Sequence, residues 1–175
     1  MAAIVNYPNP RLHKPAMWVT DIHAKDVQDM IDDMLLTLEQ HETAAAFAAN
    51  QLDYAKPYRI TVIHYHRDKN SPMVLVNPEL SEHEGEQLEY EACMSVYPNQ
   101  FGEEVKRAFK VRVKALDRDG NPIDFVAEDF LAKCVQHEVD HLEGKVYLQR
   151  LSPLRFKRLK QKIEKMLKEE MRKKV

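Results

Sequence analysis

The sequence predicts one α+β domain, in which mostly antiparallel strands surround a central helix, with an amphipathic helix before them and a basic helix after them. Apolar residues recur at helical spacing near both ends of the chain, and segments rich in β-branched and aromatic residues lie between. The chain has 175 residues, of which 44% are hydrophobic. A chain of this size can bury a core without disulfides or a structural metal, so any metal it binds is expected to serve a function.

The first half of the chain carries one helical pattern followed by strand patterns. Residues 26–40 are predicted to form an amphipathic helix, because their apolar side chains recur every three or four residues and make one buried stripe. Residues 58–65, 73–77 and 109–117 show the alternation or the short apolar runs that are typical of strands. The apolar helix positions are Val27, Met30, Ile31, Met34, Leu35 and Leu38.

A hairpin and a second helix are predicted to follow. The dipeptide at residues 119–120, Asp-Gly, predicts a turn that leads into a strand at residues 123–127. Asp129 is placed to cap a helix that runs to about Leu142, and Gly144 is placed to end it. This segment is expected to be the central helix of the fold.

The last element is predicted to be a basic helix packed on the same domain. Ser152 and Pro153 form a good N-cap and first-turn pair, and apolar residues recur every three or four positions after them. Residues 150–175 contain 11 basic and three acidic side chains, a net charge of +8, whereas the rest of the chain carries −10. We therefore expect a body at residues 1–150 and a basic amphipathic helix at residues 151–175, an asymmetry that can indicate a nucleic-acid partner.

The composition favours a cytoplasmic protein that does not associate with a membrane. The N-terminus lacks the basic and apolar regions of a signal peptide, and the apolar run at residues 44–49 is far shorter than the ~20 residues that span a bilayer. The two cysteines, Cys93 and Cys134, are expected to be thiols or metal ligands in a reducing compartment rather than a disulfide.

The strongest functional pattern is His137-Glu138-Val139-Asp140-His141, which falls within the predicted central helix. Residues four apart lie on one helical face, about 6 Å from each other, so both imidazoles can bind one metal ion. Glu138 lies one residue further round, where it can contact a water molecule at the metal. The alternative is a surface helix with two unrelated histidines, because the five-residue pattern also arises by chance.

Two histidines do not complete a metal site, so a third protein ligand is required. Cys134 is a poor candidate, because it lies about 7.5 Å along the helix axis from the midpoint of the histidines and helical Cβ atoms tilt further away. We expect Cys134 to pack beside the site as a small hydrophobic residue. Cys93 is then the candidate, and a thiolate with two imidazoles suits Zn²⁺ or Fe²⁺ better than Mg²⁺ or Ca²⁺.

Three motifs in order make the chain resemble the peptide deformylases, metalloenzymes that remove the formyl group from the N-terminal methionine of nascent chains. The family patterns are Gly-apolar-Gly-apolar-Ala-Ala-x-Gln, Glu-Gly-Cys-apolar-Ser and His-Glu-x-x-His. They read AAAFAANQ at residues 44–51, EACMS at residues 91–95 and HEVDH at residues 137–141. The resemblance covers nearly the whole chain, and the order and spacing of the motifs agree with the family.

The resemblance implies a role for each of the following residues. Glu138 is expected to be the general base and acid, and the Gln51 side-chain amide and the Met94 backbone N–H are expected to bind the formyl oxygen. The ligand set implies one divalent cation, Fe²⁺ in the cell with Zn²⁺ or Ni²⁺ as substitutes. The implied metal ligands are Cys93, His137 and His141. The residues expected to contact substrate are Ala46, Glu91, Phe130, Lys133 and Cys134.

The sequence departs from the family near the expected substrate pocket. Three family glycines are alanines here, Ala44, Ala46 and Ala92, which costs backbone freedom or narrows the cleft by a methyl group. Lys133 stands where the family has an aliphatic residue that lines the methionine pocket. Our hypothesis is that Lys133 pairs with Glu89 at the pocket wall and makes it more polar; the alternative is that Lys133 extends to solvent.

Two other functions are compatible with these patterns. An HExxH metallopeptidase shares the water-activating chemistry, but its third ligand is commonly Glu or His rather than Cys. A divergent deformylase-like protein, with another N-acyl substrate or with metal or ribosome binding alone, would account for the alanines and for Lys133.

The partners expected from the resemblance are formylmethionyl nascent peptides and, through the basic helix, the ribosome. The charge of +8 over residues 150–175 suits RNA phosphates. The alternative for this helix is a solvated charged face over a packed apolar stripe. We expect the protein to act as a monomer.

Overall fold

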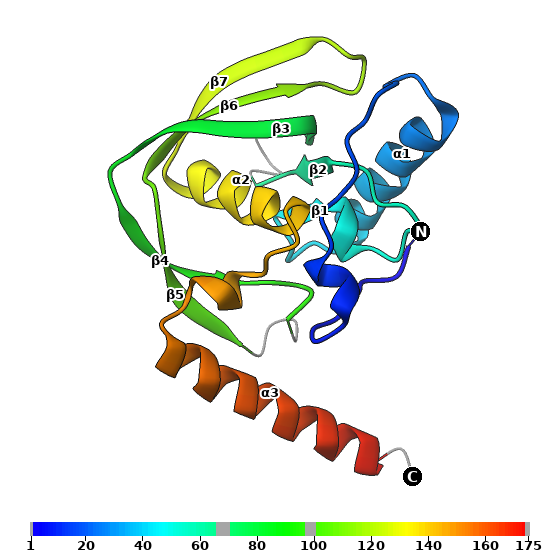
Figure 1. Ribbon diagram of the computed structural model, residues 1–175. Helices are drawn as coiled ribbons and strands as arrows, with labels where there is room; N and C mark the ends of the chain where they lie inside the picture. The colour runs from blue at the N-terminus through cyan, green and yellow to red at the C-terminus, as the bar shows by residue number, and fades with distance from the viewer. Residues whose placement is uncertain (1, 66–70, 97–100, 174–175) are drawn as a thin grey trace.

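The computed structural model describes residues 2–65, 71–96 and 101–173. In this part of the chain, the strands form two antiparallel sheets (Figure 1). The larger sheet has the strand order β1-β2-β3-β6-β7, and the smaller sheet pairs β4 with β5. The strands are β1 (Ala46–Ala48), β2 (Ile60–Ile63), β3 (Met73–Glu84), β4 (Gln87–Ala92), β5 (Gly102–Arg107), β6 (Lys110–Leu116) and β7 (Pro122–Glu128).

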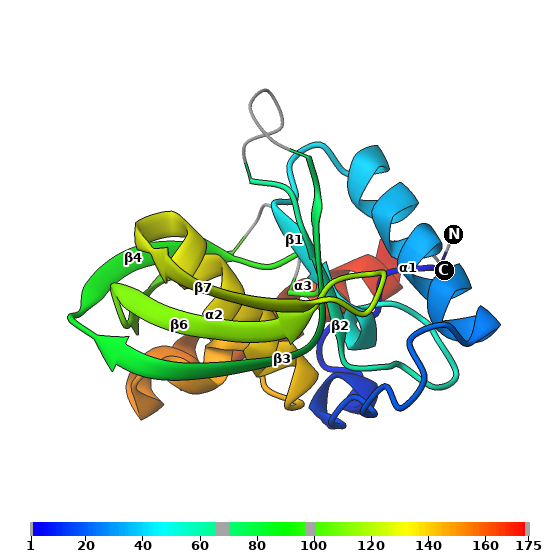
Figure 2. The same ribbon diagram turned by 90° about the horizontal axis from the view of Figure 1, so that it is seen from above.

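The described residues also form three α-helices, α1 (Lys25–Gln40), α2 (Asp129–Leu142) and α3 (Pro153–Lys173). The helix α2 contacts all the strands of the larger sheet and lies between that sheet and the β4–β5 pair (Figure 1). In Figure 2, β3, β6 and β7 run side by side as a curved layer over α2, and α1 lies at the other end of the molecule. The α+β class, with antiparallel strands and three helices, is therefore confirmed.

The position of α2 follows from its residues. Ala132 and Val135 are fully buried against the apolar side chains of the larger sheet, including Val111 and Val113 of β6. The last part of the helix is buried on every side, although much of it is polar. Buried polar groups require partners, so this segment is expected to carry interactions that the rest of the fold supplies. Its buried polar residues are Gln136, His137, Glu138, Asp140 and His141.

The two ends of α2 differ in how well the sequence predicts them. The N-cap position is held by Glu128, whose side chain makes no capping bond, so the prediction that Asp129 caps the helix is wrong. Asp129 instead has a φ of 52°, and its N–H donates to the Phe109 carbonyl where the chain turns from β7 into the helix. Gly144 ends the helix as predicted, with a φ of 75°, and a Cβ there would lie 2.7 Å from the His13 carbonyl oxygen.

The strand predictions are correct in part. The segments predicted at residues 73–77 and 109–117 correspond to β3 and β6, and the predicted turn joins β6 to β7 in a hairpin. However, β3 is longer than predicted, and β1, β4 and β5 were not predicted. The strand β1 has only three residues, and most of β4 is exposed, so neither shows the alternating burial on which the prediction depends.

The helix α3 begins where the sequence predicts it. The Ser152 hydroxyl accepts a bond of 3.4 Å from the Arg155 N–H, and Pro153 is the first helical residue. Leu159 and Ile163 are its buried side chains and share a core cluster with Val105 of β5, so the helix lies along one side of the molecule (Figure 1). Among the described residues, no helix is both long and apolar enough to cross a membrane.

Candidate metal centre and active site

Three potential ligands meet at one point between the end of β4 and α2. Cys93 follows β4, and His137 and His141 lie one turn apart on α2. The Cys93 Sγ atom is 3.2 Å from His141 Nε2, and the two histidine Nε2 atoms are also 3.2 Å apart. Their ligand atoms all lie within 4.8 Å of one another, so a single small cation can contact all three.

The two histidines differ in how their surroundings affect protonation. His137 Nδ1 is 2.8 Å from a Glu91 carboxylate oxygen, which orients the ring so that Nε2 faces the other ligands. Burial lowers the pKa of His141 well below its usual value, which favours the neutral ring that a metal requires. Burial also opposes charge on His137, but contacts with Cys93 and Glu91 outweigh it and raise its pKa, so a cation competes with a proton there.

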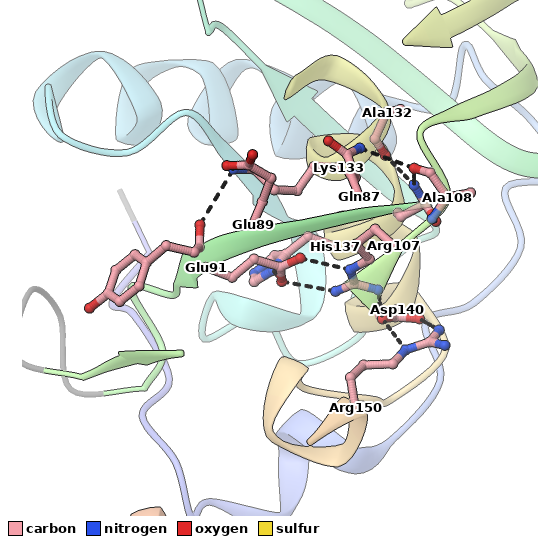
Figure 3. Close-up of polar contacts among 12 residues, drawn as sticks. Gln87, Glu89, Glu91, Arg107, Ala108, Ala132, Lys133, His137, Asp140 and Arg150 are labelled. Atoms are coloured by element: carbon pink, nitrogen blue, oxygen red, sulfur yellow. Dashed lines mark hydrogen bonds and ion pairs between the residues drawn. The ribbon is translucent and has the colours of Figure 1, made fainter. Parts of the chain in front are cut away.

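A buried chain of charged groups supports His137 from behind (Figure 3). Arg107 donates to both oxygens of Glu91, at 2.7 and 3.0 Å, and to Asp140 at 2.5 Å. Asp140 also accepts from the partly exposed Arg150, at 2.5 and 3.0 Å. Burial raises the pKa of Glu91, but the bonds from Arg107 and His137 outweigh it and lower the value to about 2. Glu91 is therefore a carboxylate at neutral pH, and its oxygens already have protein partners.

Glu138 has the properties of a proton carrier. The residue is 3% exposed, and burial raises its pKa to about 7, with the nearby Glu91 charge acting in the same direction. Its Oε2 atom has no hydrogen-bond partner among the described residues. A buried carboxylate with a free oxygen and a pKa near neutrality can take up and release a proton at physiological pH.

Gln51 is held with its amide facing the centre. It ends a short 3₁₀ helix that directly follows β1, and its Oε1 accepts the Ala48 N–H at 2.8 Å. The Nε2 group therefore points the other way, where it lies 3.4 Å from both Cys93 Sγ and Ser95 Oγ. This amide is a donor beside the ligand cluster. Met94 lines the same cavity, next to Cys93 in the chain.

One cavity connects these groups with the residues expected at the substrate. Glu138, Gln51, Cys93 and His137 all contribute to its wall. The structure thus brings the predicted catalytic, metal-binding and substrate residues together, but it favours a different task for Glu91. We expected Glu91 to contact substrate, whereas its carboxylate orients His137. The predicted substrate residues that line the cavity are Ala46, Glu91, Phe130, Lys133 and Cys134.

Sequence reasoning missed the residues behind the site. Arg107 lies in β5, a strand that was not predicted. No local sequence pattern links it to Asp140, which is 33 residues away. Asp140 itself is part of the HEVDH motif, so its burial could have been anticipated from the central position of α2. Cys134, by contrast, lies where it was expected, buried in the cavity wall and outside the ligand cluster.

A thiol and two imidazoles that face one point, with a buried carboxylate beside them in an open cavity, form the kind of site that a metal-dependent hydrolase requires. The chain belongs to the peptide deformylase family: residues 1–157 match the family model described as polypeptide deformylase. The chain is an enzyme of this family, whose members carry out metal-dependent deformylation. This assignment replaces the metallopeptidase alternative.

Known proteins resemble the chain over nearly its whole length. Peptide deformylase 1 of Coxiella burnetii is 45% identical over 166 residues, which cover 95% of this chain and 96% of that protein. A crystal structure of a peptide deformylase from Legionella pneumophila has a TM-score of 0.86 at 36% identity and covers 98% of both chains. The peptide deformylase of Ehrlichia chaffeensis in complex with actinonin has a TM-score of 0.83 at 26% identity, covering 95% of this chain and 97% of that one.

Proposed function

We propose that this enzyme removes the formyl group from the N-terminal methionine of new proteins and that Glu138 moves the proton in this reaction. The observation that carries the proposal is the Glu138 carboxylate, which is buried with a free oxygen in the wall of the cavity that also contains the ligand cluster. The family assignment supports the reaction, and the geometry supports the assignment of individual residues.

Each residue has one task in the proposed mechanism. A divalent cation held by the three ligands would supply a Lewis acid, which makes a water molecule easier to deprotonate near neutral pH. Glu138 takes the proton of the attacking water and delivers it to the leaving amine, a role typically worth ~10²- to 10⁴-fold. The Gln51 amide and the Met94 backbone N–H donate to the formyl oxygen, each contributing about 3 kcal/mol. The C–N bond then breaks, releasing formate and a free amine. The proposed ligands are Cys93, His137 and His141.

We propose Fe²⁺ as the physiological ion, with Zn²⁺ and Ni²⁺ as functional substitutes. One thiolate and two imidazoles are compatible with all three ions. Affinity alone favours Zn²⁺ over Fe²⁺, so the occupant depends on metal supply and on protection from oxidation.

The first test is formate release from formyl-Met-Ala-Ser by protein purified anaerobically with Fe²⁺. We expect turnover that stops when a chelator removes the metal and returns when Fe²⁺ is added back, because the cation supplies the Lewis acid. Protein that holds one equivalent of metal but releases no formate would contradict the proposal and would favour the divergent binding protein instead.

The Lys133→Ile variant is expected to process formyl-Met-Ala-Ser more efficiently than the wild type. The Lys133 side chain is only 12% exposed, lines the cavity and has its ammonium 3.8 Å from a Glu89 oxygen, so an extended solvated conformation is not supported. An isoleucine side chain would offer the methionine thioether an apolar contact in place of the Lys133 ammonium. We expect kcat/KM to rise about tenfold, the scale of one changed contact in a pocket. An unchanged kcat/KM would show that Lys133 does not contact the methionine.

We further propose that residues 1–150 act as the catalytic body, that the basic helix at 151–175 contacts ribosomal RNA, and that the protein is a cytoplasmic monomer. Leu159 and Ile163 fix one face of α3 on the body, and its remaining surface is strongly basic. This arrangement leaves the charged face available to phosphates.

Replacing Lys157, Arg158 and Lys162 by glutamine is expected to weaken co-sedimentation with ribosomes without affecting formate release. These residues are exposed on α3, so their loss removes phosphate contacts but no packing. Binding by the wild type should fall steeply with added salt, and less steeply for the triple variant. A control that replaces the exposed Lys25, Lys106 and Lys145 should bind like the wild type. If the α3 variant bound ribosomes as well as the wild type, or if both triple variants were weakened equally, the proposal that α3 makes the contact would be wrong.

A further inference from the structure

Lys133 places an ammonium group in the wall of the active-site cavity. It lies one turn before His137 on α2, and side chains at this spacing are about 5–6 Å apart at their Cβ atoms. Its side chain is mostly buried, and it shares the cavity with Cys93 and Glu138. Figure 3 shows Lys133 reaching toward β4, on the side of α2 that also carries His137.

The Lys133 ammonium has hydrogen-bonding capacity that its neighbours leave largely unused. An ammonium carries three donors. The described residues provide one long hydrogen bond, of 3.4 Å, to the Tyr90 carbonyl oxygen. The Glu89 carboxylate is 3.8 Å away, which is an ion-pair distance rather than a hydrogen bond, and the Phe130 ring lies beneath the ammonium at 4.7 Å. These contacts hold the charge in place and leave a donor for a ligand.

The side chain of the first substrate residue must enter this same cavity. The formyl carbon has to lie beside Glu138 and Gln51, and the amide nitrogen joins it directly to the carbon that bears the side chain. A methionine thioether is a weak hydrogen-bond acceptor, so it gains little from a nearby ammonium. Oxidation of the sulfur creates a polar sulfoxide, whose oxygen is a strong acceptor on a side chain of the same length.

We propose that Lys133 is a specificity-determining residue that allows this enzyme to deformylate peptides beginning with methionine sulfoxide. Its ammonium donates a hydrogen bond to the sulfoxide oxygen while Glu89 and Phe130 keep it in position. The reaction is unchanged: water cleaves the formyl C–N bond, formate and the amine leave, and the sulfoxide is not altered. The proposal depends on the deformylase function proposed above and adds a substrate class to it.

The test compares formyl-Met(O)-Ala-Ser with formyl-Met-Ala-Ser on the same preparation of metal-loaded enzyme. The ratio of the two kcat/KM values is independent of the fraction of active protein, so a partly folded variant still gives a valid result. We expect the wild type to cleave the sulfoxide within tenfold of methionine. Lys133→Ile should lower the ratio of sulfoxide to methionine kcat/KM about a hundredfold, roughly tenfold from the gain on methionine expected above and at least tenfold from the lost hydrogen bond to a charged group. Lys133→Arg should keep the ratio close to that of the wild type.

A binding measurement provides a readout that does not depend on turnover. Calorimetry with the products Met(O)-Ala-Ser and Met-Ala-Ser should show the same change in relative affinity for Lys133→Ile. The matched control is Lys106→Ile, which removes an exposed lysine paired with Glu86 outside the cavity and should leave both ratios unchanged.

Two results would overturn the proposal while the deformylase function stands. One is a ratio that falls in Lys133→Ile by no more than the tenfold gain expected on methionine, and the other is a wild type that cleaves the sulfoxide more than tenfold less efficiently than methionine. Release of formate from neither peptide would overturn the deformylase function itself, and the inference with it.

Discussion

The Glu138→Gln variant is expected to lose deformylase activity by about 10²- to 10⁴-fold while it keeps its metal. Glutamine has nearly the same shape as glutamate but cannot accept the proton of the attacking water. Burial already raises the pKa of Glu138 to about 7, so the neutral side chain adds no new burial penalty and the variant should fold. The loss is therefore expected in kcat rather than in stability.

The measurement is kcat on formyl-Met-Ala-Ser together with metal content on the same samples. The matched control is Glu143→Gln, because Glu143 follows the same helix but its side chain is 42% exposed and pairs with Lys145. We expect this control to be as active as the wild type. If Glu138→Gln kept more than a tenth of the activity, another group would have to move the proton. Loss of metal from this variant would instead assign Glu138 to metal binding.

The part of the site that sequence alone predicts is the part that depends on local geometry. His137 and His141 are four residues apart, so forming any helix there brings them to one face, and Glu138 follows with them. The third ligand required more than periodicity. Cys134 was rejected because a helix places it too far from the two histidines along the helix axis. Cys93 is 48 residues from His141 in the chain, and only the folded structure brings the two side chains together.

The parts that were not predicted depend on contacts between distant segments. The strand β4 exposes most of its side chains, so its sequence shows no alternation of apolar and polar residues. Its role is to deliver Glu91 to His137, which is 46 residues away in the chain. Arg107 also could not be placed from the sequence. Its local sequence is typical of a charged surface residue, but the residue is only 4% exposed in the structure. A buried arginine is recognisable only when its carboxylate partners are known.

Substituting Arg107 by methionine is expected to destabilise the protein by about 3–5 kcal/mol, the usual effect of removing one partner from a buried ion pair. Arg107 bridges Glu91 and Asp140, and both carboxylates are nearly inaccessible to water. Without it, two buried acidic groups lose their shared counter-charge. A loss of this size is a large part of the 5–15 kcal/mol that typically separates folded from unfolded domains.

The free energy of unfolding in urea, measured for the metal-loaded wild type and variants, tests this expectation. Arg112→Met is the matched control, because Arg112 also bridges two carboxylates, Glu82 and Asp124, but does so in solvent, where such pairs contribute little. A comparable loss in both variants would mean that burial does not strengthen the Arg107 contacts. The Arg107 variant should also bind metal ~10- to 100-fold more weakly, since Glu91 would no longer be held against His137. Weakened metal binding with unchanged stability would separate the two effects and limit Arg107 to orienting the ligand.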